Sequence, residues 1–230
     1  MQVATHDLLD QAQAVIAGLL DPAVAVAVCD PRQPQPAVLP EEQLQIASAV
    51  PSRQAEFAAG RAAARAAMRQ LGVTPVAIPM RADRAPKWPA GLRGSISHTS
   101  TLCAAAVTNG GQLIGLDVEH DSDLLTDLLP TVCSALEQSR IAGPAQARLA
   151  KLIFSAKEAA YKAQYPASGL LFGFDHLDVT LDLPNRTFTA TFLHPAVCFA
   201  AGDRLHGRFD HVAGHIVTAV SIPQVHKKGA

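Results

Sequence analysis

Residues 153–162 read IFSAKEAAYK, an alanine-rich run that favours a helix and contains several ionisable side chains. Residues four positions apart share one face of a helix. Glu158 and Lys162 therefore point the same way, and Lys157 and Tyr161 form a neighbouring pair. An amphipathic surface helix would show the same pattern, so the meaning of this stretch depends on the motifs that precede it.

Two carboxylates precede this helix on a predicted strand. Residues 116–119 read LDVE, and side chains alternate along a strand, so Asp117 and Glu119 share one face. Two acids in that position repel each other unless a cation lies between them, and oxygen ligands suit Mg²⁺. A solvent-facing strand edge with two acids is the alternative.

The N-terminal half contains a row of cations on a second alanine-rich helix, predicted within residues 52–71. Arg53, Arg61 and Arg65 fall along one side of that helix. Guanidinium groups bind phosphate oxygens through two hydrogen bonds, so the row is a candidate polyphosphate site. A solvated basic face is the alternative.

The order of predicted elements is typical of an α+β protein. A helix at 6–20, a buried strand at 23–29 and the helical region 41–71 open the chain. The Asn-Gly-Gly turn at 109–111 predicts a hairpin between strands in its two flanks, 101–108 and 112–119. After them we predict two helices, an aromatic loop, four strands and a disordered tail, at residues 131–140, 145–162, 164–174, 175–183, 186–193, 203–210, 215–222 and 223–230.

The composition argues against several classes of protein. Hydrophobic residues make up 49% of the 230 residues, enough for a sizeable core, and a net charge of −1 disfavours bulk binding to nucleic acid. No apolar run approaches the roughly 20 residues that span a membrane, and the first residues lack a secretory signal. The four cysteines are scattered without a Cys-x-x-Cys motif, which disfavours zinc and indicates reduced thiols. We therefore expect a cytoplasmic protein.

The acids and the cations together indicate a chemistry. Asp117, Glu119 and Glu158 could hold a divalent metal, while lysines and arginines around them could hold a phosphorylated ligand. Metal, cations and phosphate together indicate phosphoryl chemistry or the binding of a nucleotide-like cofactor.

Three motifs also resemble a known family. GSISH (94–98), IGLDVE (114–119) and FSAKEAAYK (154–162), in that order, are similar to the signature set of Sfp-type 4′-phosphopantetheinyl transferases. EFAAGRAAAR (56–65) and PKWP (86–89) resemble the EntD-like branch associated with siderophore synthesis. The resemblance covers roughly residues 52–174.

This resemblance implies a fold and a reaction. Two similar α+β halves with pseudo-twofold symmetry would enclose the active site: a nucleotide-binding half at 1–113 and a catalytic, metal-binding half at 114–222, before a flexible tail at 223–230. The implied enzyme transfers the 4′-phosphopantetheine arm of coenzyme A to a serine of an apo acyl, peptidyl or aryl carrier protein. It would depend on Mg²⁺, with Mn²⁺ as an alternative ion, and release adenosine 3′,5′-bisphosphate. We expect a monomer with no nucleic acid or membrane partner.

The resemblance also implies roles for individual residues. Asp117, Glu119 and Glu158 match metal-binding acids, with Glu158 also a candidate base beside Lys162, which would contact the pyrophosphate. His98 is an alternative base, although the resemblance places it near the 3′-phosphate.

The implied coenzyme A site consists of Arg53, Arg61, Arg81, Lys157 and Lys162, together with the Ser97-His98 pair that would touch the phosphates. Arg53 and Arg61 would hold the adenosine end, and Lys157 the phosphopantetheine part. The family pattern expects a basic residue where Met80 stands, and the neighbouring Arg81 could substitute for it.

Two other classes remain open at this stage. One is a metal-dependent hydrolase of coenzyme A or nucleotide pyrophosphates, and the other is a binding module without activity. No motif identifies the carrier protein or its pathway.

Overall fold

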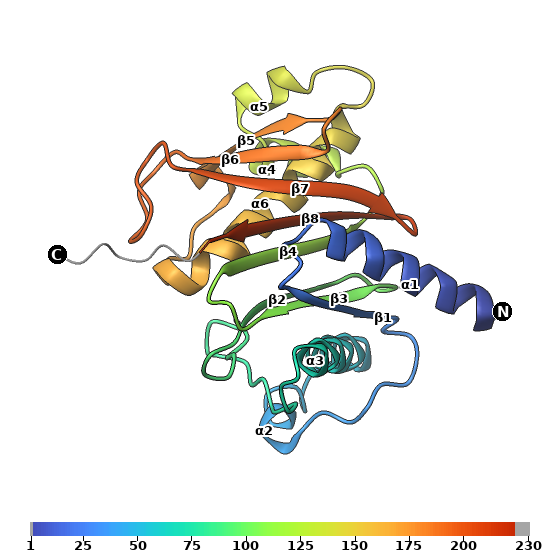
Figure 1. The fold of residues 1–230 in the computed structure, drawn as a ribbon. Helices are drawn as coiled ribbons and strands as arrows, with labels where there is room; N and C mark the ends of the chain where they lie inside the picture. The colour runs from blue at the N-terminus through green and yellow to red at the C-terminus, as the bar shows by residue number, and fades with distance from the viewer. Residues whose placement is uncertain (1, 224–230) are drawn as a thin grey trace.

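The computed structural model describes residues 2–223 as an α+β protein with two antiparallel sheets (Figure 1). The small sheet has the strand order β1-β3-β2, with bounds Ala25–Cys29, Cys103–Thr108 and Arg93–His98. The large sheet has the order β4-β8-β7-β6-β5, with bounds Leu113–His120, His215–Ile222, Arg204–Val212, Thr187–Phe192 and Leu177–Asp182. The predicted α+β class is confirmed. From residue 224 on, the predicted tail lies outside the described residues.

One long helix packs on each sheet: α3 (Pro51–Gln70) on the small sheet and α6 (Gln146–Ser168) on the large one. Their alanines allow close contact, since Ala59 and Ala159 are fully buried. The contact is closest at Gly115 of β4, where an added Cβ would lie 1.8 Å from the carbonyl oxygen of Ala159. Only glycine therefore fits at this position.

Shorter helices complete the fold. They are α1 (Gln2–Gly18), α2 (Pro40–Gln43), α4 (Leu129–Val132), α5 (Ala135–Arg140) and the 3₁₀ turns η1 (Thr126–Leu128) and η2 (Phe174–His176). Helix α1 lies across both halves and contacts β1 and β7 (Figure 1). Of the helices in the described range, none is long and apolar enough to cross a membrane.

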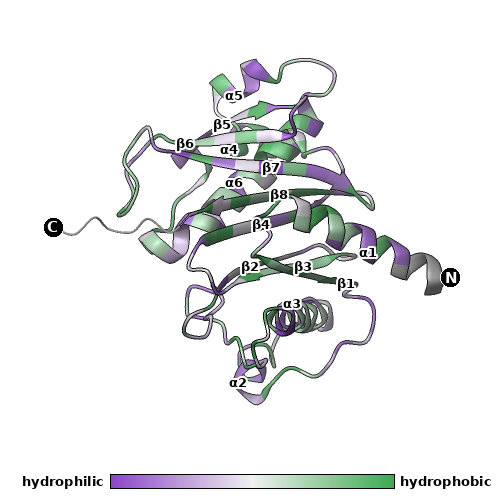
Figure 2. Cartoon of the chain, in the orientation of Figure 1, coloured by the Kyte–Doolittle hydropathy of each residue, from purple (hydrophilic) through white to green (hydrophobic). Residues whose placement is uncertain are grey.

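A hydrophobic cluster fills the seam between the two sheets. It unites Ile16 of α1 and Val26 of β1 with Leu116 of β4 and Val217 of β8. Figure 2 shows β4 and β8 coloured mostly as hydrophobic at the centre of the molecule. Burial of this shared cluster holds the two halves together.

Side-chain hydroxyl groups link β2 to β4 across the seam. The Ser95 and Ser97 hydroxyls accept hydrogen bonds from the backbone N–H groups of Leu116 and Val118, at 3.0 and 3.2 Å. These two strands belong to different sheets, so the hydroxyls take the place of a backbone ladder. The serines of the GSISH motif thus fix the position of the strand that contains Asp117.

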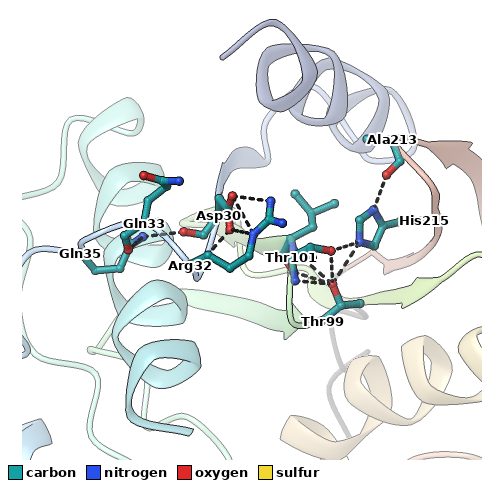
Figure 3. Close-up of polar contacts among 9 residues, drawn as sticks. Asp30, Arg32, Gln33, Gln35, Thr99, Thr101, Ala213 and His215 are labelled. Atoms are coloured by element: carbon teal, nitrogen blue, oxygen red, sulfur yellow. Dashed lines mark hydrogen bonds and ion pairs between the residues drawn. The ribbon is translucent and has the colours of Figure 1, made fainter. Parts of the chain in front are cut away.

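A histidine ties the β2–β3 turn to the start of β8 (Figure 3). His215 Nε2 lies 3.1 Å from the Thr99 hydroxyl and 2.9 Å from the Thr101 hydroxyl, while its Nδ1 lies 2.8 Å from the Ala213 carbonyl oxygen. A neutral imidazole satisfies these contacts if Nδ1–H donates to the carbonyl and Nε2 accepts from the hydroxyls. Burial lowers the pKa of His215 and favours that neutral form.

The predicted hairpin across residues 109–111 is wrong. Strand β3 pairs with β1 on one side and β2 on the other, whereas β4 pairs with β8 along its whole length. Both edges of β3 are therefore occupied, and the Asn-Gly turn leads from one sheet into the other. Strand β3 forms its hairpin with the preceding strand, β2, instead.

Three helix predictions also need correction. Helix α6 continues past Lys162 through Pro166 to Ser168, so the loop predicted from residue 164 begins at Gly169, whose φ is +64°. Fully buried Gln164 anchors this last turn, because its amide donates to the Leu170 carbonyl oxygen. The helical region 41–71 is interrupted before Pro51 as predicted, but its first part ends early, at Gln43 of α2. The predicted helix 131–140 forms two helices, α4 and α5.

Candidate active site

The cleft between the halves contains all the site residues predicted from the sequence except Lys157 and Arg65. One cavity of about 320 Å³ lies between α3, the loop at 81–88, β2 and α6. A second cavity of about 310 Å³ lies over β4 and α6. His98 and Lys162 line both cavities, so the two adjoin. The first cavity is lined by the predicted arginines and the second by the predicted acids, namely Arg53, Arg61 and Arg81, and Asp117, Glu119 and Glu158.

Asp117 is the most firmly held acid of the second cavity. Its side chain is only 4% exposed and accepts hydrogen bonds from the Ser97 hydroxyl at 2.9 Å and the Ser155 hydroxyl at 2.8 Å. The Lys162 ammonium lies 2.6 Å from Asp117 Oδ1 and 3.1 Å from the Ser97 hydroxyl. Residues from β2, β4 and α6 therefore meet at one carboxylate.

The other two acids differ in their partners. Glu119 forms an ion pair with Lys151 of α6. Among the described residues, no hydrogen bond or ion pair is found for the side chain of Glu158, which lies about two turns after Lys151 on α6. Burial raises the pKa of Glu158, with Lys162 opposing the shift and Asp117 and Glu119 adding to it. This carboxylate is therefore a stronger base than a solvated glutamate.

The three acids are suitable ligands for a hard divalent cation, because all of them offer carboxylate oxygens to one cavity. Their placement is not that of a complete cage: within residues 2–223 no group of three or more His, Cys, Asp or Glu side chains is arranged to hold a metal ion. Lys162 and Lys151 already neutralise Asp117 and Glu119. A bound cation would have to displace these ammonium groups from the carboxylates.

At the cationic end, Arg53 and His98 are in direct contact. Arg53 Nη1 lies 2.8 Å from His98 Nε2 and 3.3 Å from a Glu56 carboxylate oxygen. Burial lowers the pKa of His98, with Glu56 opposing the shift. His98 is thus a neutral acceptor for the Arg53 guanidinium, and Arg53 remains 46% exposed in its side chain, facing the cavity.

Arg61 is a buried cation whose charge is only partly compensated. It is 5% exposed, its Nε donates to the Ile78 carbonyl oxygen at 2.7 Å, and its guanidinium carbon lies 4.1 Å from the centroid of the Phe57 ring. No carboxylate pairs with it among the described residues. Burial lowers its pKa to about 10, so it stays charged at neutral pH and would be stabilised by an anion in the cavity.

Arg65 does not join this site, so the predicted row of three arginines is corrected to two. Its Nη1 binds both carboxylate oxygens of Glu42, at 3.0 and 2.9 Å, in the interior. Glu42 also accepts from the backbone N–H of Ile78. This buried pair fastens α2 and the segment around Ile78 to α3.

Lys157 is also directed away from the two cavities. Its side chain is 2% exposed, and its ammonium group donates to Glu137 at 2.8 Å and to the carbonyl oxygens of Val132 and Phe174 at 2.9 Å. These partners use all three of its donors. Lys157 instead lines a smaller cavity of about 100 Å³, which Glu158 also borders.

Sequence reasoning missed two partners of the acids, Lys151 and Ser155. A signal for them exists in the helix period, because Lys151, Ser155, Glu158 and Lys162 follow the spacing i, i+4, i+7, i+11. It also missed the contact that closes the first cavity, in which the Tyr165 hydroxyl of α6 donates to Asp83 of the 81–88 loop. No local pattern links two residues so far apart in the chain.

Comparisons with known proteins match both halves of the chain. The sequence model of the 4′-phosphopantetheinyl transferase N-terminal domain matches residues 41–108, and that of the 4′-phosphopantetheinyl transferase superfamily matches residues 113–219. The chain is 36% identical over 200 residues to the 4′-phosphopantetheinyl transferase Svp of Streptomyces mobaraensis, covering 84% of this chain and 81% of Svp.

Two further relatives point the same way. The 4′-phosphopantetheinyl transferase PptT of Mycobacterium tuberculosis is 30% identical over 193 residues, 79% of this chain and 85% of PptT. Enterobactin synthase component D of Salmonella typhimurium is 38% identical over 162 residues, 67% of this chain and 64% of that protein, which confirms the predicted EntD-like relationship. With cavities that unite cationic and acidic side chains and relatives that match most of its length, the chain belongs to the 4′-phosphopantetheinyl transferase family of enzymes.

Proposed function

We propose that this enzyme transfers the 4′-phosphopantetheine arm of coenzyme A to a serine of an apo carrier protein and releases adenosine 3′,5′-bisphosphate. The main support is the junction of two adjoining cavities, one cationic and one acidic, with Lys162 lining both. A long ligand with a phosphate at one end and a pyrophosphate in its middle suits such a pair. Acyl, peptidyl and aryl carrier proteins are the candidate acceptors, and a monomeric, cytoplasmic enzyme remains our prediction.

In this proposal the adenosine 3′-phosphate end binds in the first cavity. Within residues 2–223 no carboxylate pairs with Arg61, Arg53 extends from the same helix, and neutral His98 lies against Arg53. Arg81 lines the same cavity from the 81–88 loop. Guanidinium groups suit a phosphate because their paired N–H donors match its oxygens.

The pyrophosphate would lie where the cavities meet, against Lys162. Its ammonium group would exchange Asp117 for a phosphate oxygen, which frees that carboxylate. Mg²⁺, or Mn²⁺ in its place, when bound at Asp117, Glu119 and Glu158, would neutralise pyrophosphate charge. Ser155 would orient Asp117 toward the ion, while the Lys151 ammonium group would move away from Glu119 to admit it.

Glu158 would accept the proton of the carrier serine on a carboxylate oxygen. The serine oxygen would bond to the β-phosphorus as the phosphorus–oxygen bond to the adenosine 3′,5′-bisphosphate breaks. A raised pKa suits this role, because a general base works best when its pKa approaches the working pH. Lys162 would stabilise the charge that spreads over the phosphoryl oxygens.

The test is mass spectrometry of an apo carrier protein incubated with this enzyme, coenzyme A and Mg²⁺. We expect the carrier to gain the mass of one phosphopantetheine, and a serine-to-alanine carrier to gain none. If coenzyme A is instead cleaved without a carrier, the protein is a pyrophosphate hydrolase. An unmodified panel of acyl, peptidyl and aryl carriers would contradict the proposal.

A further inference from the structure

Two cysteines face each other behind the cationic cavity. Cys29 of β1 and Cys103 of β3 are direct partners in the antiparallel register of the small sheet. Side chains at such positions share one face, with Cβ atoms about 4.5–5.5 Å apart, whereas a disulfide needs about 3.5–4.5 Å. A shift of about 1 Å would therefore allow the two sulfurs to bond.

The two thiols differ in environment. Cys29 is partly exposed and its Sγ–H donates to the Ala59 carbonyl oxygen at 3.3 Å, whereas Cys103 is fully buried. Hydrogen bonding from Cys103 lowers the pKa of Cys29, although burial and Asp30 oppose it, and the pKa of Cys103 is raised well above its usual value. Cys29 is thus the thiol that an oxidant reaches first, and Cys103 the thiol that would resolve the product.

Both sulfurs touch the elements that form the cationic cavity. Cys29 contacts Ala59, and a Cβ added to Gly60 would lie 3.9 Å from the Cys103 sulfur, so both pack under the turn of α3 that precedes Arg61. Cys103 is also the register partner of His98 in β2. A bond between the sulfurs would therefore move the backbone next to two cavity residues.

We propose that Cys29 and Cys103 are a peroxide-sensitive pair whose cross-strand disulfide weakens binding of the phosphorylated ligand at Arg61 and His98. The identity of that ligand as coenzyme A rests on the proposed function.

The chemistry balances with one hydroperoxide. The Cys29 thiolate takes an oxygen from hydrogen peroxide to give a sulfenic acid and hydroxide, which takes up the proton lost by the thiol to form water. The Cys103 sulfur then bonds to Cys29 and expels a second water. Two thiols are oxidised by two electrons and the peroxide is reduced. Strain from the strand spacing makes such a disulfide readily reducible by thiols, so the change is reversible.

The test treats the full chain with one equivalent of hydrogen peroxide, blocks the remaining thiols and maps peptides by mass spectrometry. We expect a linked peptide joining Cys29 to Cys103, lighter than its two parts by two hydrogens. Cys29→Ser should lack it, while Cys198→Ser, which removes an exposed cysteine elsewhere, should keep it.

Ligand binding is then measured by calorimetry with adenosine 3′,5′-bisphosphate, which has no thiol that could reduce the disulfide. Oxidised protein should bind it several-fold more weakly, and dithiothreitol should restore the affinity. In Cys29→Ser the affinity should not respond to peroxide.

Two results would overturn the proposal. One is over-oxidation of Cys29 without a linked peptide, and the other is a linked peptide with unchanged affinity. Because peptide mapping needs no transferase activity, failure of the transfer assay would not affect the disulfide result.

Discussion

Two arginines one helical turn apart have different roles in this enzyme. Arg61 lines the cationic cavity without a carboxylate partner among the described residues, whereas Arg65 is paired with Glu42 in the interior. Their spacing alone predicts a shared function, because both lie on one side of α3. The difference arises from α2, which places Glu42 beside only one of them.

We predict that removing the Arg61 guanidinium group affects ligand binding, whereas removing the Arg65 group affects stability. Arg61→Met should raise the KM for coenzyme A with a smaller effect on kcat, because this end of the ligand is remote from the bond that breaks. Arg65→Met should leave the charge of Glu42 buried and cost about 3–5 kcal/mol of stability. Steady-state kinetics and urea unfolding of both variants separate the two effects. An unchanged KM in Arg61→Met would remove that residue from the site.

A second prediction concerns Glu158. Glu158→Gln keeps the shape of the side chain but removes its proton acceptor, so kcat should fall about 10²–10⁴-fold with an unchanged circular dichroism spectrum. Glu41→Gln, an exposed change in α2, is the matched control and should retain full activity.

The pH profile gives an independent check on Glu158. Burial raises the pKa of this carboxyl in the metal-free enzyme, and a base must be deprotonated to act, so the rate should fall on acidification. That acid limb should be absent from the residual activity of Glu158→Gln. An identical limb in both proteins would assign it to another group.

The contact between β4 and α6 sets the position of the acids relative to Glu158. Gly115→Ala should lower stability by at least about 1–3 kcal/mol, because its Cβ would overlap the Ala159 carbonyl oxygen. Gly18→Ala is a suitable control, since no atom lies within 4 Å of its added Cβ. Thermal unfolding of the two variants should show a lower Tm only for Gly115→Ala. Equal Tm values would mean that the helix moves aside without cost.

Most elements could be predicted from local pattern, but their pairing could not. Apolar alternation located the strands, and alanine density located α3 and α6. The hairpin predicted from the Asn-Gly turn is wrong because β3 already has a neighbour on each edge. Strand β4 instead pairs with β8, about a hundred residues later in the chain. Ser95 and Ser97 belong to a motif visible in the sequence, yet their bonds to β4 depend on that distant pairing.

The stability of the whole molecule should fall in acid because of a histidine at the seam between the two sheets. His215 is buried with a lowered pKa, while in the unfolded chain its value is near 6.5. Below that value the unfolded chain binds more protons, so stability is full above about pH 6.5 and is lost as the pH falls. In His215→Gln the amide oxygen can still accept hydrogen bonds from Thr99 and Thr101. This variant should lose less stability between pH 7.5 and 5.5 than the unsubstituted protein does.

Urea unfolding at both pH values measures this difference. His98 also has a lowered pKa but is present in both proteins, so the comparison isolates His215. An equal acid effect in the two proteins would contradict the assignment.

At this scale the sequence predicted the meeting of three motifs but not the groups that hold the halves together. The motifs 94–98, 114–119 and 154–162 do converge on one cleft, as the family resemblance implied. Helix α1 and His215 lie outside those motifs, and their contacts depend on elements from opposite ends of the chain. The interior position of Lys157 could not be predicted either, because its partner Glu137 belongs to a separate helix.

The serine bonds between β2 and β4 have a consequence for how the polypeptide can be divided. No backbone ladder joins the two sheets in the described part of the chain, so severing the peptide bond between Gly110 and Gly111 would leave every strand pair intact. Two fragments produced separately would each retain a complete sheet and could reassemble by docking, which makes this enzyme a candidate for split-reporter complementation.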